Sequence, residues 1–387
     1  MIAITNGKIV TVCGDIIEKG TVLIDGGKIV AVGADVTAPE GAEVIDATGK
    51  WVTPGLIDCH THISTFNEPR DFGSQCDGNE MTNPITAHIR GIDALNPHDT
   101  AIAAARSAGF TTCYTGPGSA NLICGTGIAF KCKQGSTVYD IAIPGSECMK
   151  MALGQNPISI RELNSAYPFT RMGNGGMLRE ALFNAQQYAI NKQKHEAGEL
   201  KDFKPDFKLE ALFPLLTGKM KARIHCHRAD DVVTATRVAK EFGFQYTIEH
   251  CTEGYKILDY LKDNDVTCVV GPLLMDPYKN ELWDVRLTTP AEMEKKGINF
   301  CLTADTSSET KWLPVHVGIA MANGLSEKTA FECVTIRPAR LLGLDDRMGT
   351  LEPGKDADIA IFDGHPFSNF THCVTTIIDG KVEYARA

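Results

Sequence analysis

The sequence predicts an α/β fold: a (β/α)8 barrel of the TIM type with a small β-sandwich built from both ends of the chain. Short alternating segments with tight turns fill both termini, whereas strand-like and helix-like segments alternate between them. The length of 387 residues suits one large barrel with an accessory piece. A doubly wound open sheet is the alternative architecture.

The two termini are expected to be all-β and to pair with each other. Alternating apolar segments and glycine-containing turns predict strands at residues 4–10, 21–25, 28–32, 44–48, 357–362 and 373–383. The last of these is broken at Asp379-Gly380, much as the first hairpin is broken at Asp25-Gly26-Gly27. We therefore expect a β-sandwich domain of residues 1–54 plus 345–387 and a barrel of residues 55–344.

In the middle of the chain, segments with the two-residue periodicity of strands alternate with segments that have the periodicity of helices. Strands are predicted at residues 109–114, 148–153, 222–227, 245–250, 266–270 and 299–304, and helices at 100–107, 178–194, 230–242, 252–262 and 326–334. Gly116-Pro117-Gly118 does not qualify as a dinucleotide-binding loop, because Asn121 stands where the third glycine belongs and Pro117 interrupts the turn.

Composition narrows the range of partners. The net charge of −10 disfavours nucleic acid, and the apolar runs are too short to cross a membrane. The N-terminus lacks a basic segment followed by a long apolar one, and the 13 cysteines show no C-x-x-C spacing. We expect a cytoplasmic protein with reduced thiols that acts on a small molecule, with a homo-oligomer as an open alternative to a monomer.

Two His-x-His pairs carry the strongest chemical signal. His60 and His62 end the apolar run 54–59, and His225 and His227 end the run 220–224. Residues two apart on a strand point to the same side, so each pair can converge on a metal ion. Chance placement of 11 histidines makes one such pair unremarkable, but two at strand ends are much less expected.

Further candidate ligands end other predicted strands. Lys150 lies in the apolar stretch 149–153, His250 ends the strand at 245–250, and Asp305 follows the strand at 299–304. In barrels of this kind the functional side chains stand at the carboxyl ends of the strands. All of these candidates are therefore expected on one rim.

The order of these residues resembles the amidohydrolase superfamily. Residues 53–58 (TPGLID) precede the first pair and residues 349–358 (GTLEPGKDAD) lie near the end, so that the similarity spans nearly the whole chain. The chain is similar to the imidazolonepropionase-like and Xaa-Pro dipeptidase-like branch. The resemblance implies a metal-dependent hydrolase that cleaves a C–N bond.

The resemblance also implies roles for the ligands. One or two divalent ions, expected to be zinc, would be held by His60, His62, Lys150, His227, His250 and Asp305, with Lys150 carrying a CO2-derived carbamate. An ammonium has no lone pair, so Lys150 must first become a neutral amine, which an apolar neighbourhood favours. Such ions lower the pKa of bound water from about 15.7 to about 7, and Asp305 would be the general base.

Two details stay open at this level. His225 is an alternative ligand or a partner that orients one, and His227 is preferred because family members often have an acidic residue three positions later, here Asp230. If Lys150 is an ordinary lysine, the site holds one metal, with Glu147 as a further candidate ligand. Cys59 and Cys226 are expected in the core.

The sequence says less about which residues bind the substrate. Arg171, in the polar and partly helical stretch 155–217, is the candidate for a substrate carboxylate, because guanidinium binds carboxylate bidentately. Asn121 and His88 are weaker candidates. The stretch itself is expected to cover the rim as a lid or to contact another subunit.

The main hypothesis is an amide hydrolase for a dipeptide or an N-acyl amino acid. The alternative enzyme is a deaminase or cyclic-amide hydrolase with a single metal. A catalytically silent barrel that serves in binding or assembly is disfavoured, because the chain keeps every expected ligand.

Overall fold

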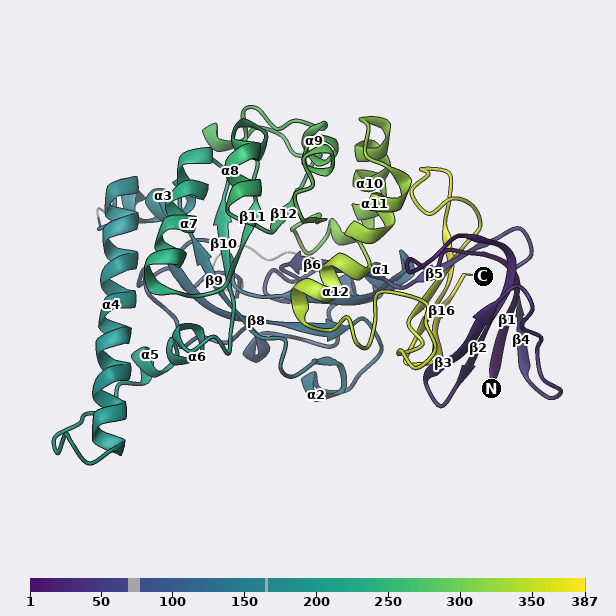
Figure 1. Cartoon of the computed structure of the whole chain (residues 1–387), viewed down its shortest axis with the longest axis horizontal. Coiled ribbons are helices and arrows are strands. Elements are labelled where there is room, and N and C mark those ends of the chain that lie inside the picture. Colours follow the sequence, from purple (N-terminus) through teal and green to yellow (C-terminus); the bar gives the residue numbers. More distant parts are fainter. Residues whose placement is uncertain (69–76, 164–165, 387) are drawn as a thin grey trace.

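The computed structural model describes residues 1–68, 77–163 and 166–386, and two eight-stranded sheets organise it (Figure 1). One sheet forms the barrel and the other joins the two ends of the chain. In the described ranges, no helix combines the length and apolarity needed to cross a bilayer.

The barrel sheet keeps its strands in chain order. They are β6 (Leu56–Thr61), β7 (Phe110–Thr115), β8 (Ile123–Lys131), β9 (Cys148–Ala152), β10 (Ala222–Cys226), β11 (Tyr246–His250), β12 (Cys268–Val270) and β13 (Phe300–Leu302). The two outermost strands are brought together just beyond β13, where the Thr303 hydroxyl lies 2.8 Å from Asp58 Oδ1 and 2.6 Å from the carbonyl oxygen of His60. The sheet is therefore a nearly closed barrel.

One barrel strand corrects the predicted topology. Strand β8 was not predicted, and it runs antiparallel to both β7 and β9, whereas the other neighbours pair in parallel. No helix separates β7 from β8. The expectation of eight regular βα units is therefore wrong at this point, although the barrel does have eight strands.

Helices cover the outside of the barrel (Figure 1). They are α1 (Thr100–Ser107), α2 (Val138–Ile141), α3 (Gln155–Leu163), α4 (Arg171–Glu196), α5 (Phe207–Glu210), α6 (Phe213–Leu216), α7 (Ala229–Phe242), α8 (Leu258–Asp263), α9 (Thr289–Lys296), α10 (Leu313–Ala322), α11 (Glu327–Cys333) and α12 (Ile336–Leu342). Helix α7 shows why such segments are helical: Val232, Ala235, Val238 and Ala239 recur on one buried face, and Gly243 ends the helix in a left-handed conformation. The long α4 packs against α7 and α6.

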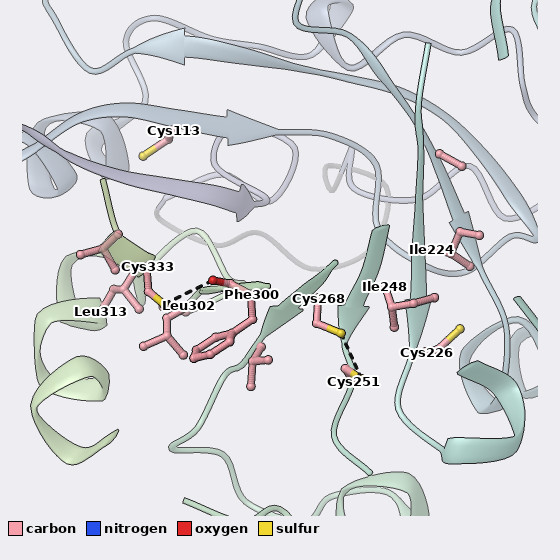
Figure 2. Close-up of a cluster of buried hydrophobic side chains, with 14 of the residues drawn as sticks. Cys113, Ile224, Cys226, Ile248, Cys251, Cys268, Phe300, Leu302, Leu313 and Cys333 are labelled. Carbon is pink, nitrogen blue, oxygen red and sulfur yellow. Dashed lines mark hydrogen bonds between the residues drawn. The ribbon is translucent and has the colours of Figure 1, made fainter. Parts of the chain in front are cut away.

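Side chains alternate between two apolar clusters across the barrel sheet. Ile224, Cys226 and Ile248 belong to the cluster that faces the helices (Figure 2). Cys148 and Cys301 belong to a second cluster: Cys301 stands between Phe300 and Leu302 of the first cluster, and Cys148 directly precedes Met149 of the first. This second cluster is therefore the interior of the barrel. Lys150, between Met149 and Met151 of the outer cluster, points to the same interior.

The second sheet confirms that the two chain ends pair. Its strands are β1 (Ile2–Ile9), β2 (Ile17–Asp25), β3 (Lys28–Gly33), β4 (Glu43–Asp46), β5 (Trp51–Pro54), β14 (Ile359–Phe362), β15 (Cys373–Ile378) and β16 (Lys381–Ala385). Strand β14 pairs with β5, so residues far apart in sequence lie side by side. The chain passes at Gly55 into the barrel, where a Cβ atom would lie 2.1 Å from the Thr111 side chain. We propose that this sheet is the β-sandwich and that the boundaries are those stated above.

A buried ion cluster joins the two sheets. Lys131 ends β8 of the barrel, and its Nζ contacts the carboxylates of Asp356, Asp358 and Asp379 from the C-terminal strand region. The Lys131 side chain is only 4% exposed. Although burial opposes it, these carboxylates raise the pKa of Lys131, so that the lysine is charged. The ammonium of Lys131 therefore offsets the charge of the three carboxylates, which lie within 4.8 Å of one another.

Candidate functional site

Four of the predicted ligands meet where β6 adjoins β13. Asp305 Oδ1 lies 3.2 Å from His60 Nε2 and 3.5 Å from His62 Nε2. The ligand atoms of these three residues all lie within 4.8 Å of one another. Lys150 Nζ, from β9, is 3.2 Å from the same His60 Nε2. The first predicted pair, the lysine and the aspartate are thus brought together.

Three further histidines form a second group beside the first. Ligand nitrogens of His225, His227 and His250 also lie within 4.8 Å of one another. The ring centroid of His250 is 4.4 Å from that of His225 and 4.7 Å from that of His227. It is 5.0 Å from the ring centroid of His60, so the two groups adjoin. The arrangement can hold two metal ions side by side.

Backbone carbonyls fix the orientation of two ligand rings. His62 Nδ1 lies 2.9 Å from the carbonyl oxygen of Gly116, and His250 Nδ1 lies 2.7 Å from that of Gly271. A carbonyl oxygen can only accept, so each Nδ1 carries the proton and each Nε2 keeps its lone pair. Ligating histidines are commonly held in this way, with the free nitrogen directed at the metal.

Two ligands stand on a backbone conformation that L residues rarely adopt. The φ angle is 71° at His250 and 70° at Asp305. Each such residue costs of order 1–3 kcal/mol and persists only where its surroundings impose it. In both cases the bend comes at the end of a strand and turns the side chain into the site. Two of the eight described non-glycine residues with positive φ are therefore candidate ligands.

The electrostatics prepare these groups to bind a cation. Burial lowers the pKa of His62 and of His250 to about 3, which leaves both imidazoles neutral at pH 7. Burial also lowers the pKa of Lys150. For Asp305 burial acts to raise the pKa, but His250, His60 and His62 outweigh it and hold the pKa well below its usual range. Neutral imidazoles surround one carboxylate anion.

The two histidines of the second His-x-His pair do lie close together. However, Asp230, the residue that led us to prefer His227 as the ligand, does not interact with His227. Asp230 Oδ1 accepts a hydrogen bond of 2.9 Å from Arg228 Nε, and it does not contact His227. His227 Nδ1 instead lies 2.8 Å from the Thr252 hydroxyl. Burial lowers the pKa of both His225 and His227 well below its usual range. Both therefore stay candidates on equal electrostatic terms.

Sequence reasoning missed a buried ion pair behind His60. Glu249 Oε2 contacts His60 Nδ1 and accepts a hydrogen bond of 2.7 Å from Arg223 Nη2. The other carboxylate oxygen, Oε1, accepts hydrogen bonds of 3.2 Å from Arg223 Nε and 2.5 Å from the Thr247 hydroxyl. Burial acts to raise the pKa of Glu249, but Arg223 and His60 hold it below its ordinary value. The only sequence signal is position: Arg223 precedes His225 by two residues, and Glu249 directly precedes His250.

At the centre of the site, two buried atoms have no hydrogen-bond partner in the described part of the chain. They are His225 Nε2 and Asp305 Oδ1. A buried polar atom without a partner costs free energy, and these two are of the types that bind divalent metals. The residues present therefore fit a metal ion.

A cavity of about 290 Å³ opens onto both ligand groups. It is small for a ligand pocket, since such pockets usually measure about 300–1,000 Å³. Its walls are formed by His62, Phe66, Asn79, Gly118, Ser119, Asn156, His225, His227, His250, Met275, Tyr278, Asp305, Thr306 and Ser307. Asn156 comes from α3, so the start of the stretch 155–217 does reach the rim.

Arg171 and Glu147 lie outside this cavity. Arg171 Nε is 3.0 Å from Asp231 Oδ2, and its Nη2 is 2.7 Å from Glu281 Oε1. The guanidinium is thus engaged by carboxylates of the protein itself. Glu147 Oε2 accepts a hydrogen bond of 2.8 Å from the backbone of Gly145 and joins neither ligand group.

Asn121 and His88 also serve the surrounding structure. Asn121 is buried; its Oδ1 accepts a hydrogen bond of 2.6 Å from Arg161 Nη2, and its Nδ2 donates one of 2.9 Å to the Thr86 hydroxyl. His88 lies in a turn, with its ring centroid 6.0 Å from that of Phe207. Neither residue lines the cavity.

Comparisons with known proteins agree with this geometry. The model of the amidohydrolase family matches residues 51–382. A crystal structure of an amidohydrolase from Thermotoga maritima MSB8 is 37% identical, covers all of both chains and superimposes with a TM-score of 0.94. A Xaa-Pro dipeptidase with bound methionine shares the fold at 16% identity and a TM-score of 0.57.

Curated relatives are more distant in sequence. Imidazolonepropionase from Maricaulis maris is 25% identical over 93% of this chain and 92% of its own length. Amidohydrolase tasK from Hapsidospora irregularis is 27% identical over 94% of this chain, which spans only 40% of that longer protein. Members of this family use divalent metals and act on small molecules, and each of the two ligand groups could hold a metal ion. The chain therefore belongs to the amidohydrolase family and is a hydrolase that acts on carbon–nitrogen bonds.

Proposed function

We propose that the protein is a metal-dependent amide hydrolase for a small molecule such as a dipeptide or an N-acyl amino acid. The observation that carries this proposal is the meeting of two ligand groups and a buried lysine at one small cavity. Each group alone could be a set of ordinary polar residues. Together they offer more ligands than one ion needs.

The proposed cofactor is a pair of divalent ions, most simply zinc, which suits imidazole and carboxylate ligands. His60, His62 and Asp305 would hold one ion, and His250 with a histidine of the second pair would hold the other. When bound, such ions polarise a carbonyl group and lower the pKa of water at the site. Protein purified without chelator should contain one to two equivalents of metal, and metal-free protein whose activity ignores added metal would refute the proposal.

Asp305 is proposed as the general base. The histidines hold its pKa well below the usual range, so the carboxylate is an anion at neutral pH and can receive a proton. It would take a proton from the attacking water and pass it to the leaving nitrogen, a transfer that contributes about 10²- to 10⁴-fold in rate. It stands on the cavity wall, where it can reach both partners.

Lys150 is proposed to carry a carbamate. The neutral amine adds to CO2 and releases a proton, and burial favours that neutral form by lowering the pKa of Lys150. The two carbamate oxygens would then serve as the ligands shared by both ions. ¹³C-bicarbonate should give a carbamate carbon signal that Lys150→Ala lacks.

The metal content of Lys150 variants also tests whether Lys150 carries a carbamate. Lys150→Ala should lose metal and activity, and acetate should restore part of both by supplying carboxylate oxygens. Lys150→Arg should not behave like wild type, because a guanidinium neither takes up CO2 nor binds metal. An active Lys150→Arg enzyme would leave only a single-metal hydrolase standing.

We propose His225 as the ligand from the second pair, which reverses the preference stated for His227. The supporting observation is that His225 Nε2 is buried without a hydrogen-bond partner. The bond from His227 Nδ1 to Thr252 does not count against His227, because the candidate ligands His62 and His250 are also held through Nδ1. His225→Asn should release about one equivalent of metal, and His227→Asn should not. The opposite pattern would assign the ligand to His227.

Metal stoichiometry and substrate profile separate the proposed function from its alternative. A deaminase or cyclic-amide hydrolase with a single metal would retain full activity at one equivalent. A screen of dipeptides, N-acyl amino acids and cyclic ureides with metal-loaded protein distinguishes the substrate classes.

A further inference from the structure

A buried lysine stands behind the wall of the cavity. The Lys279 side chain is 6% exposed, and its Nζ donates a hydrogen bond of 2.6 Å to Asn156 Oδ1. Asn156 in turn donates 2.7 Å from Nδ2 to the Ser119 hydroxyl. Asn156 and Ser119 both line the cavity. The ammonium is therefore one side chain away from the space that a substrate would fill.

Most of the hydrogen-bonding capacity of this ammonium is unused. An ammonium has three N–H donors, and within the described part of the chain only the one to Asn156 is satisfied. Its nearest carboxylate oxygen, Glu281 Oε2, is 3.7 Å away, which is too long for a hydrogen bond. The other oxygen of Glu281 is already shared by Arg171 Nη2 and the backbone N–H of Gln155, at 2.7 and 2.6 Å.

The charge of Lys279 also reaches the reacting groups. Burial lowers the pKa of Lys279 to about 8, while Glu281 and Asp305 act to raise it, so that the lysine stays mainly charged at pH 7. Next to it, Tyr278, which is 65% exposed, lines the cavity. Lys279 thus stands one side chain behind the cavity wall, and its neighbour Tyr278 forms part of that wall.

We propose that Lys279, with Asn156 and Tyr278, forms a subsite for a carboxylate of the substrate, which narrows the substrate class to small amides that carry a free acid group. The inference rests on the proposed amide hydrolase activity and assigns to Lys279 the part that the sequence suggested for Arg171. The carboxylate accepts the unused donors of Lys279 while the amide lies beside Asp305. The small cavity limits such a substrate to about the size of a dipeptide or an N-acyl amino acid.

The test compares acids with their matched amides. N-acetyl-L-amino acids and the corresponding N-acetyl-L-amino acid amides are measured for binding to metal-loaded protein by calorimetry, and for hydrolysis where it occurs. Wild type should bind the acid at least about 10-fold more tightly than its amide, because loss of a buried charge partner weakens binding by such factors. Lys279→Gln should lose that preference through a raised Kd or KM for the acid alone, with kcat and binding of the amide little changed.

Two further variants separate recognition from a structural role. Lys279→Arg keeps a cation and should retain part of the acid preference, whereas Lys256→Gln removes an exposed lysine and should change nothing. A general loss of affinity for acid and amide alike in Lys279→Gln would show that Lys279 only supports the fold. If the variant does not fold, wild type alone decides, since equal affinity for acid and amide overturns the subsite.

The failure of this inference differs from the failure of the proposed function. Hydrolysis of amides without any acid preference overturns the subsite and leaves the hydrolase intact. An acid preference in binding that depends on Lys279, without hydrolysis of any tested amide, keeps the subsite and overturns the proposed activity.

Discussion

Replacing Glu249 by glutamine should destabilise the protein strongly, although the residue binds no substrate. The carboxylate is fully buried, and the guanidinium of Arg223, 1% exposed, makes two hydrogen bonds to it. Glutamine keeps one acceptor oxygen but removes the negative charge. Arg223 would then be a buried cation without an anion.

The size of the effect follows from this burial. Removing one partner of a buried ion pair costs about 3–5 kcal/mol, because the remaining charge is not solvated. The oxygen retained by glutamine places Glu249→Gln near the lower end, at about 3 kcal/mol. Arg223→Met should cost a similar amount. The double variant should cost much less than the sum of the two, with a coupling energy of at least about 2 kcal/mol.

Urea unfolding of the metal-free proteins, followed by circular dichroism, measures these costs without a contribution from metal. Glu241→Gln is the matched control, because its carboxylate also binds an arginine, Arg179, but at the exposed surface. It should unfold at nearly the same urea concentration as wild type. A Glu249→Gln variant as stable as the control, or a coupling energy near zero, would refute the reasoning. In the metal-loaded protein, loss of the partner of His60 should weaken metal binding by about 10- to 100-fold.

Three other changes test separate parts of the structure. Asp305→Asn should keep the fold and most of the metal but lower turnover by about 10²- to 10⁴-fold in steady-state assays, and near-normal turnover would place the base elsewhere. His316 is buried, and burial lowers its pKa to about 4. Between about pH 6.5 and pH 4 this histidine is therefore protonated in the unfolded chain but neutral in the folded protein, so the free energy of unfolding falls as the pH falls. Relative to His316→Gln, wild type should lose about 2 kcal/mol of unfolding free energy from pH 7 to pH 5, and a difference that does not change with pH would contradict this. Lys131→Met removes the buried cation shared by Asp356, Asp358 and Asp379, although Lys28 and Arg347 still pair with Asp356 and Lys133 with Asp379. It should cost several kcal/mol in urea unfolding, and a variant as stable as wild type would contradict this.

Most of the barrel could be predicted because its strands carry a clear periodicity. Strand β8 could not, since Gly125 and Gly127 dilute its apolar pattern. Both glycines are required by close backbone contacts: a Cβ atom would lie 2.4 Å from the carbonyl oxygen of Ile89 at Gly125 and 2.5 Å from that of Thr115 at Gly127. The residues that make this strand possible are those that remove its signal.

The candidate ligands could be predicted for a related reason: all but Lys150, which lies in the middle of β9, stand close to or just beyond the carboxyl end of a strand, and these ends share one rim. Residues that act through distant partners leave no such signal. The partners of Arg171, namely Asp231 and Glu281, are 60 and 110 positions away. Lys279 likewise depends on Asn156, 123 positions earlier, which becomes a neighbour only in the folded barrel. Local spacing predicts ligands on one strand, but it does not predict which charges meet across the barrel.

The left-handed backbone at His250 and Asp305 has a consequence for how the protein can change. Glycine adopts this conformation without a steric penalty, so a glycine at either position would relieve strain while removing a ligand. Selection for heat resistance alone would therefore favour loss of the site, and selection for turnover must continually oppose it. Stability and catalysis compete at the same two backbone positions, where the barrel strands end.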